Sequence, residues 1–313
     1  MDVSSALALG QTALELGLFC SLTVLALFLS YNMLNVCDLS TDGCFTLGAA
    51  VGASVAISGH PLLSIPAAMA AGVCSGYVTS FLQTRAGINS LLAGIIVNTG
   101  LYSVNIAVMG GASLLNMNKT ETVFTMMKAA LAGGMLEKQY KLIVGLIAAA
   151  LVILFLSFFL KTRLGLAIRA TGNNPDMVRS SSINPVFTTT IGLCIANSFT
   201  ALSGCLLAQS QKSANIDMGT GMVTIALASL LIGGILFSKR RGIAVRAVCS
   251  VVGALIFRLV YTAALRFNMP AYMLKLVSSV IVIIAISAPY LKKQLPKLKR
   301  RLELRKKKEV SKV

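Results

Sequence analysis

The chain has 313 residues, of which 56% are hydrophobic and 12% charged, and its mean hydropathy is +0.81. A soluble globular protein carries about 25% charged residues, so this composition excludes an ordinary soluble domain and indicates a polytopic membrane protein. The net charge of +18 does not indicate a nucleic-acid partner, because the basic residues lie in loops and a tail without interleaved aromatic side chains.

Roughly nine apolar stretches are long enough, or nearly so, to cross a bilayer as helices. They cover residues 11–31, 44–59, 62–83, 88–109, 140–161, 186–209, 222–238, 243–266 and 272–290. The second and seventh are short and rich in glycine, which is typical of broken or tilted helices. The sequence therefore predicts an all-α polytopic membrane protein, with a transmembrane domain over residues 1–290 and a basic tail over residues 291–313.

Basic residues predict the orientation, because cytoplasmic loops carry an excess of Lys and Arg. The tail holds eleven of them between Lys292 and Lys312, so we expect it to be cytoplasmic. Successive spans cross the membrane in alternating directions. Counting back from the tail therefore places residues 161–185 and Arg85 inside, and residues 110–139 and the N-terminus outside. The tail also repeats leucine at helical spacing, which predicts an amphipathic helix on the anionic inner membrane lipid.

Two polar breaks interrupt the apolar pattern, at Asn35–Gly43 and at Asn215–Gly221. Each contains an Asn, an Asp and a Gly and leads into an apolar run. We expect the two breaks on opposite sides of the membrane, as an inverted repeat would place them. From its residues alone, the first break is equally a capped cytoplasmic turn in which Thr41 or Asp42 is the N-cap of the next helix.

The fourth apolar stretch carries a polar stripe formed by Gly94, Asn98, Tyr102 and Asn105. Spacings of three and four residues put these side chains on one helix face. Amides that face lipid are costly, so the stripe must face other helices or a pore. Interhelical hydrogen bonding and pore lining both remain open for it.

Residues 161–185 form a polar island between two long apolar stretches. Within it, Asn174–Arg179 predicts a very short helix, because Asn174 is a good N-cap, Pro175 suits the first helical position and Asp176 complements the positive helix start. Asn184 and Pro185 are expected to stop this helix. So short a helix is unstable alone in water, so it must dock on the membrane domain or on a partner.

The run Gly165–Asn174, closed by Ile183–Pro185, resembles the cytoplasmic loop of bacterial ABC-importer permeases. The resemblance is to the branched-chain amino acid and ribose permease family, closest to its tryptophan-type amino acid subgroup, and it extends from about residue 34 to about residue 289. The first polar break also resembles the family's Asp-Leu-Ser-x-x-Gly signature. One departure is Ser182, where relatives usually have glycine. Without the resemblance, the island is an ordinary basic cytoplasmic loop.

The resemblance implies a type II ABC importer-like permease in the bacterial plasma (inner) membrane, and a short coupling helix that sits in a cleft of the ATPase subunit. The implied partners are ABC ATPase subunits, an external substrate-binding protein and a second permease copy or a paralogue. The implied ATPase-coupling residues are Gly172, Asn174, Pro175, Asp176, Met177, Val178, Arg179 and Ser180. The pathway candidates, from the signature and the stripe, are Asp38, Ser40, Asp42, Gly43, Asn98, Tyr102 and Asn105.

We expect no catalysis and no cofactor in this chain itself. No Gly-Lys pair occurs, which excludes a glycine-rich phosphate-binding loop of the Walker type. The alternative function is an ion-coupled secondary transporter, although no acidic residue or histidine is expected at mid-membrane depth. A membrane-embedded enzyme is a weaker third class, because neither a metal cluster nor a nucleophile elbow is recognisable. The resemblance favours an amino acid as the substrate, and a sugar or a nucleoside is the alternative.

Overall fold

The computed structural model describes residues 3–130, 139–236, 242–265, 276–284 and 287. Its longer helices are α1 (Val3–Leu27), which continues as the π-helical turn η1 (Phe28–Met33), α2 (Thr41–Ile57), α3 (Ser64–Thr84), α4 (Ser90–Val108), α6 (Tyr140–Phe159), α9 (Pro185–Gln211), α10 (Met222–Leu236) and α11 (Ile243–Leu265). Its short elements are β1 (Leu114–Asn116), α5 (Val123–Ala130), α7 (Arg163–Asn173), α8 (Pro175–Ser180), β2 (Ser213–Asn215) and the 3-10 turn η3 (Ile216–Gly219).

Seven helices of the described part are long and apolar enough to cross a membrane. They match seven of the nine predicted stretches. The second predicted stretch is α2, a shorter apolar helix of 17 residues. The ninth is described only over residues 276–284 and 287, and the tail at residues 291–313 lies outside the described residues. A polytopic helical membrane protein is therefore confirmed, whereas the number nine and the orientation stay predictions.

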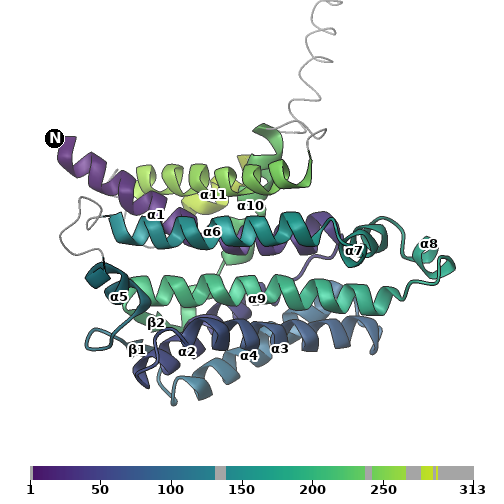
Figure 1. Ribbon diagram of the computed structural model, residues 1–313, viewed down its shortest axis with the longest axis horizontal. Helices are drawn as coiled ribbons and strands as arrows, with labels where there is room; N and C mark the ends of the chain where they lie inside the picture. Colours follow the sequence, from purple (N-terminus) through teal and green to yellow (C-terminus); the bar gives the residue numbers. More distant parts are fainter. Residues whose placement is uncertain (1–2, 131–138, 237–241, 266–275, 285–286, 288–313) are drawn as a thin grey trace, which may run out of the picture.

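Helix α9 lies at the centre of the bundle, flanked by α1, α2 and α3, and the long helices lie side by side (Figure 1). Small residues allow this close packing. A methyl group on Gly48 of α2 would overlap the backbone of Ala201 in α9, and one on Gly204 would overlap the backbone of Phe45. These backbone contacts replace side-chain interdigitation, which explains why α2 and α9 are rich in Gly, Ala and Ser.

Helix α2 starts halfway along α9 rather than at its end. The segment before α2 carries Asp38, which bonds Asn197 near the middle of α9. From there α2 runs in the same direction as α9, since Gly48 contacts Ala201 and Gly52 contacts Cys205 further on. Helix α2 is short but continuous over its 17 residues, so the expectation of a broken helix is not met there; the non-helical chain lies before it.

The two ends of the bundle carry different elements (Figure 1). Helices α7 and α8 lie at one end, where α6 finishes and α9 begins. At the opposite end, β1 pairs antiparallel with β2, with Leu114 opposite Asn215, and α5 lies nearby. Helix α7, β1 and α5 were not predicted, because all three are too short to stand out as stretches that cross a bilayer.

Candidate functional site

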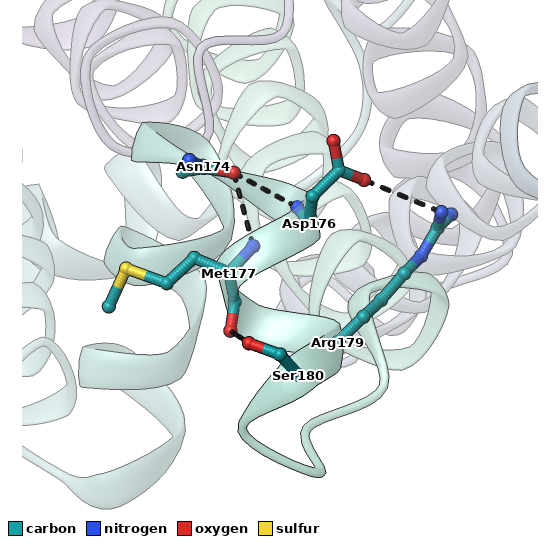
Figure 2. A network of polar contacts seen from close by, with 5 residues as sticks. All are labelled: Asn174, Asp176, Met177, Arg179 and Ser180. Atoms are coloured by element: carbon teal, nitrogen blue, oxygen red, sulfur yellow. Dashed lines mark hydrogen bonds and ion pairs between the residues drawn. The ribbon is translucent and has the colours of Figure 1, made fainter.

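The short helix α8 begins as its sequence predicts. The side-chain oxygen of Asn174 accepts hydrogen bonds from the backbone amides of Asp176 and Met177, both at 3.1 Å. Pro175 occupies the first turn, where no amide donor is needed. Asp176 and Arg179 form an exposed ion pair at 3.7 Å (Figure 2). The cap fixes the direction in which α8 leaves the bundle.

The end of α8 differs from the prediction. Its last turn is closed by Ser182, whose amide donates to the carbonyl of Arg179, and by Ile183, whose amide donates to that of Val178. This is a Schellman motif, which needs a left-handed residue, and Ser182 has φ +61°. Asn184 and Pro185 do not stop α8 but start α9, with Asn184 accepting from the Val186 amide at 3.0 Å.

Six of the eight predicted coupling residues are exposed on α8 or at its start: Asn174, Pro175, Asp176, Met177, Arg179 and Ser180. Met177 is 63% exposed, and its side chain points away from the capping network (Figure 2). Val178 is only 2% exposed, so it anchors α8 to the bundle. Exposed methionine on a rigid, capped turn is suited to an apolar contact with a partner.

Gly172 lies apart from the other predicted coupling residues, which are on α8 or at its start. It lies in α7, where a methyl group would overlap the backbone of Met33 and Leu34 at the end of η1. One residue earlier, the hydroxyl of Thr171 lies 2.8 Å from that of Thr188 in α9. Helix α7 is therefore fixed to both η1 and α9, and it connects α8 to the transmembrane core.

A polar pocket of about 300 Å³ opens between α2, α4 and η3. It is lined by Asp42, Gly43, Thr46, Asn98, Thr99, Tyr102, Asn105, Ile216, Asp217, Gly219 and Thr220. Five of the seven pathway candidates are thus brought together, from the first polar break and the stripe on α4. The stripe faces α2, since Asn105 donates to the Gly43 carbonyl at 3.1 Å.

Asp42 joins the two polar breaks. Its carboxylate accepts from the backbone amides of Gly221 at 2.9 Å and Val223 at 2.8 Å. The two breaks begin at opposite ends of the bundle, Asn35 beside α7 and Asn215 in β2, but their last residues meet at Asp42. The expectation that the whole breaks are kept apart on opposite sides was wrong. Neither Thr41 nor Asp42 is the N-cap of α2, which is Ser40; Asp42 instead satisfies free amides at the start of α10.

The other two pathway candidates, Asp38 and Ser40, lie behind the pocket in a buried polar cluster. Asp38 is 1% exposed, and its carboxylate accepts from the Ser40 amide at 2.8 Å, the Ser40 hydroxyl at 2.6 Å and Asn197 Nδ2 at 2.8 Å. The Ser40 hydroxyl also accepts from Thr79 of α3. Because Asn197 lies near the middle of α9, the expectation that no carboxylate lies at mid-membrane depth was wrong.

Sequence reasoning did not select Asp217, Thr46 or Asn197 as site residues. Asp217 belongs to the second polar break and lines the pocket, while Thr46 accepts from the Gly219 amide at 3.2 Å. The likeness of the two breaks was the available signal, but it does not say that they meet. Among the described residues, no group of three or more His, Cys, Asp or Glu is placed to hold a metal ion.

Comparison with known proteins places the chain in a family. Residues 12–286 match the family model described as branched-chain amino acid transport system / permease component. A tyrosine transport system permease protein of Clostridioides difficile is 30% identical over 296 residues, covering 94% of this chain and 96% of the relative. The ribose import permease protein RbsC of Escherichia coli is 26% identical over 251 residues, covering 80% of this chain and 75% of the relative.

An uncharacterized protein of Rickettsia prowazekii is 33% identical over 230 residues, covering 72% of this chain and 77% of the relative. No solved structure matches the chain. The matched family consists of transport subunits and not of enzymes. Both the family and the seven apolar helices of the described residues indicate a multi-pass membrane protein. The chain belongs to the family of permease components of branched-chain amino acid transport systems.

Proposed function

We propose that this chain is the transmembrane permease subunit of an ABC importer that carries an amino acid into the cytoplasm. The observation that carries the proposal is the construction of α8. It is a capped turn that exposes Met177, and Val178 and the adjoining α7 hold it against the bundle. An exposed apolar side chain on a capped helical turn is suited to bind in a cleft of a partner protein. The resemblance to ABC-importer permeases implies that this partner is an ATPase subunit.

Helix α7 provides the mechanical connection from that partner to the core. Closure of the ATPase subunits on ATP displaces α8, and α7 transmits the displacement through Gly172 to η1 and through Thr171 to α9. The segment after η1 leads directly to Asp38 and α2, which border the polar pocket. A small movement at α8 thereby changes access to the pocket without any covalent chemistry in this chain.

The pocket between α2, α4 and η3 is proposed as part of the solute pathway. Exposing amide and carboxylate side chains to lipid costs free energy, so the pocket must face water or protein. A second permease copy, or a paralogue, opposite α4 would enclose an aqueous path between the two pockets. Asp42, Gly43, Asn98, Tyr102 and Asn105 would then line this path, with Asp38 and Ser40 holding the start of α2 behind it.

The proposed orientation follows the basic residues. Helix α8 and the tail at residues 291–313 are cytoplasmic, whereas the N-terminus, β1, β2 and α5 are external. The substrate-binding protein then docks at the end of the bundle that carries β1 and β2. The pocket lies toward that end, since its lining includes η3, which directly follows β2. Solute released by the binding protein would reach it first.

An ion-coupled secondary transporter is the alternative, and Asp38 is the observation that favours it. A buried acid at mid-membrane depth is a usual carrier of a coupled ion. However, three donors already satisfy this carboxylate, two from Ser40 and one from Asn197. A carboxylate held in this way has its acceptor oxygens satisfied by the protein and stabilises the local fold without a bound ion.

The test is uptake by proteoliposomes that contain this chain, its ATPase and its binding protein. L-Tyrosine is the first probe, because it is the solute named for the Clostridioides difficile relative; ribose is the second. Internal ATP is expected to drive accumulation, and an ionophore that collapses proton and sodium gradients should leave it intact. Accumulation by this chain alone under an imposed gradient would establish the secondary-transporter function instead.

A further inference from the structure

The lining of the polar pocket carries acidic side chains but no basic ones. Asp42 and Asp217 contribute carboxylates, and Asn98 and Asn105 of α4 contribute side-chain amides. Neither Lys nor Arg is among the residues that line the pocket. An anionic solute would therefore meet repulsion there, whereas a solute with a cationic group would meet a complementary charge.

The two carboxylates of the pocket have different roles. Asp42 accepts from the amides of Gly221 and Val223, so its charge is used at the start of α10. The Asp217 side chain is exposed, and within the described part of the chain its carboxylate makes neither a hydrogen bond nor an ion pair. Only the Asp217 backbone is engaged: its amide donates to Asn215, and its carbonyl accepts from Thr220. Its charge is available to a ligand.

A second and independent observation comes from Asn105, which lines the same pocket from α4. The residue is 1% exposed, and its Oδ1 has no hydrogen-bond partner among the described residues. The amide orientation is fixed, because the Gly43 carbonyl can only accept and must face Nδ2. A buried acceptor without a donor is costly, so Oδ1 gains a favourable hydrogen bond from a donor that enters the pocket.

We infer that this pocket receives the ammonium group of the transported solute, with Asp217 as its counter-ion and Asn105 Oδ1 as a neutral acceptor. An ammonium group has three donors and no acceptor, which matches an unpaired carboxylate and an unpartnered amide oxygen. The inference rests on the proposed function, because the ligand is the solute that the permease carries. It selects a primary amine, such as an amino acid, over an uncharged sugar.

The test uses the complete transporter in proteoliposomes, with L-tyrosine uptake and binding-protein-stimulated ATP hydrolysis as separate measurements. Asp217→Asn should lower uptake about tenfold, since charged hydrogen bonds are the strong ones, while ATP hydrolysis stays stimulated. Asp217→Glu keeps the charge and should retain most uptake. Glu121→Gln makes the same charge change on an exposed external loop residue and should have no effect.

Selectivity for the amine is tested by competition at millimolar concentration. Tyramine, which keeps the ammonium group and lacks the carboxylate, should inhibit uptake by the wild type but not by Asp217→Asn. The des-amino analogue 4-hydroxyphenylpropionate should inhibit neither. The binding protein's own affinity for both analogues is measured separately, so that inhibition is assigned to the permease.

A rescue variant distinguishes loss of the Asp217 charge from misfolding of the Asp217→Asn chain. Thr220 lines the same pocket and is exposed, so Thr220→Asp in the Asp217→Asn chain returns a carboxylate nearby and should restore part of the uptake and the tyramine inhibition. Equal uptake by Asp217→Asn and wild type, or equal inhibition by the two analogues, would overturn the inference. If the wild-type complex accumulates no amine, the proposed substrate fails, whatever the variants do.

Discussion

The Asp42 carboxylate lies 2.8 Å from the backbone amide of Val223, a residue 181 positions later in the chain. Asp42 belongs to the first turn of α2 and Val223 to the first turn of α10. One negative charge therefore stabilises the positive ends of two helices at once. This contact joins the two halves of the sequence beside the polar pocket.

Asp42→Ala should destabilise the protein by about 1–2 kcal/mol, the typical loss when a helix-capping side chain is removed. Asp42→Asn keeps one acceptor oxygen and should cost less. Thermal unfolding of the purified permease in detergent measures both effects. Glu121→Ala removes a carboxylate from an exposed loop and should leave the unfolding temperature unchanged; equal shifts for Asp42→Ala and Glu121→Ala would contradict the capping role.

Ser182→Gly should stabilise the end of α8. Ser182 has φ +61°, a left-handed conformation that costs a residue with Cβ about 1 kcal/mol and costs glycine almost nothing. The gain should appear as slower hydrogen exchange of the Ile183 amide, which closes the Schellman motif. Ser181→Gly is the matched control, because Ser181 has φ −89° and glycine there should speed the exchange.

The sequence was sufficient for the start of α8 because the signals are local. Asn174, Pro175 and Asp176 act within one turn, and the structure has them in these positions. The end of α8 was harder to predict, since Asn-Pro both follows one helix and starts the next. The left-handed φ that closes α8 also has no signal in Ser182, because serine rarely adopts this conformation.

The pocket could be predicted only in part, because its contacts are non-local. Spacing on one helix was enough to group Asn98, Tyr102 and Asn105. Asp42 and Asp217 are separated by most of the chain, and no spacing rule brings them together. Asp38 looked like a residue near a helix end, because the sequence does not show that non-helical chain carries it to the middle of α9.

Gly172→Ala tests the connection between α7 and η1. Alanine is favoured over glycine inside a helix by about 1 kcal/mol, so any loss of stability must come from overlap with the Met33 and Leu34 backbone. Overpacking of this kind costs about 1–3 kcal/mol. We expect lower thermal stability and lower uptake per ATP hydrolysed. Gly100→Ala in α4 has open space around its Cβ and should be neutral or slightly stabilising.

Thiol labelling in intact cells tests the proposed orientation. On a background without native cysteines, Asn118→Cys near β1 should react with a membrane-impermeant reagent. Ser181→Cys beside α8 should react only after the cells are opened. Both residues are exposed, so a difference in labelling reports the side of the membrane and not burial. The reverse pattern would remove α8 from the ATPase side.

Met177→Asp tests whether α8 contacts the ATPase. Met177 is 63% exposed, so a charge there should leave the permease folded and inserted, whereas Val178→Asp would bury a charge and disrupt the bundle. In the complex, however, the Met177 side chain is expected to enter an apolar cleft. A desolvated aspartate would then cost at least 1.4 kcal/mol, or about a tenfold loss of affinity. Copurification of the ATPase in mild detergent measures this loss.

Leu114→Asp is the control, because Leu114 is 55% exposed at the opposite end of the bundle and its change should not affect the ATPase. Full ATPase recovery with Met177→Asp would show that the ATPase docks elsewhere.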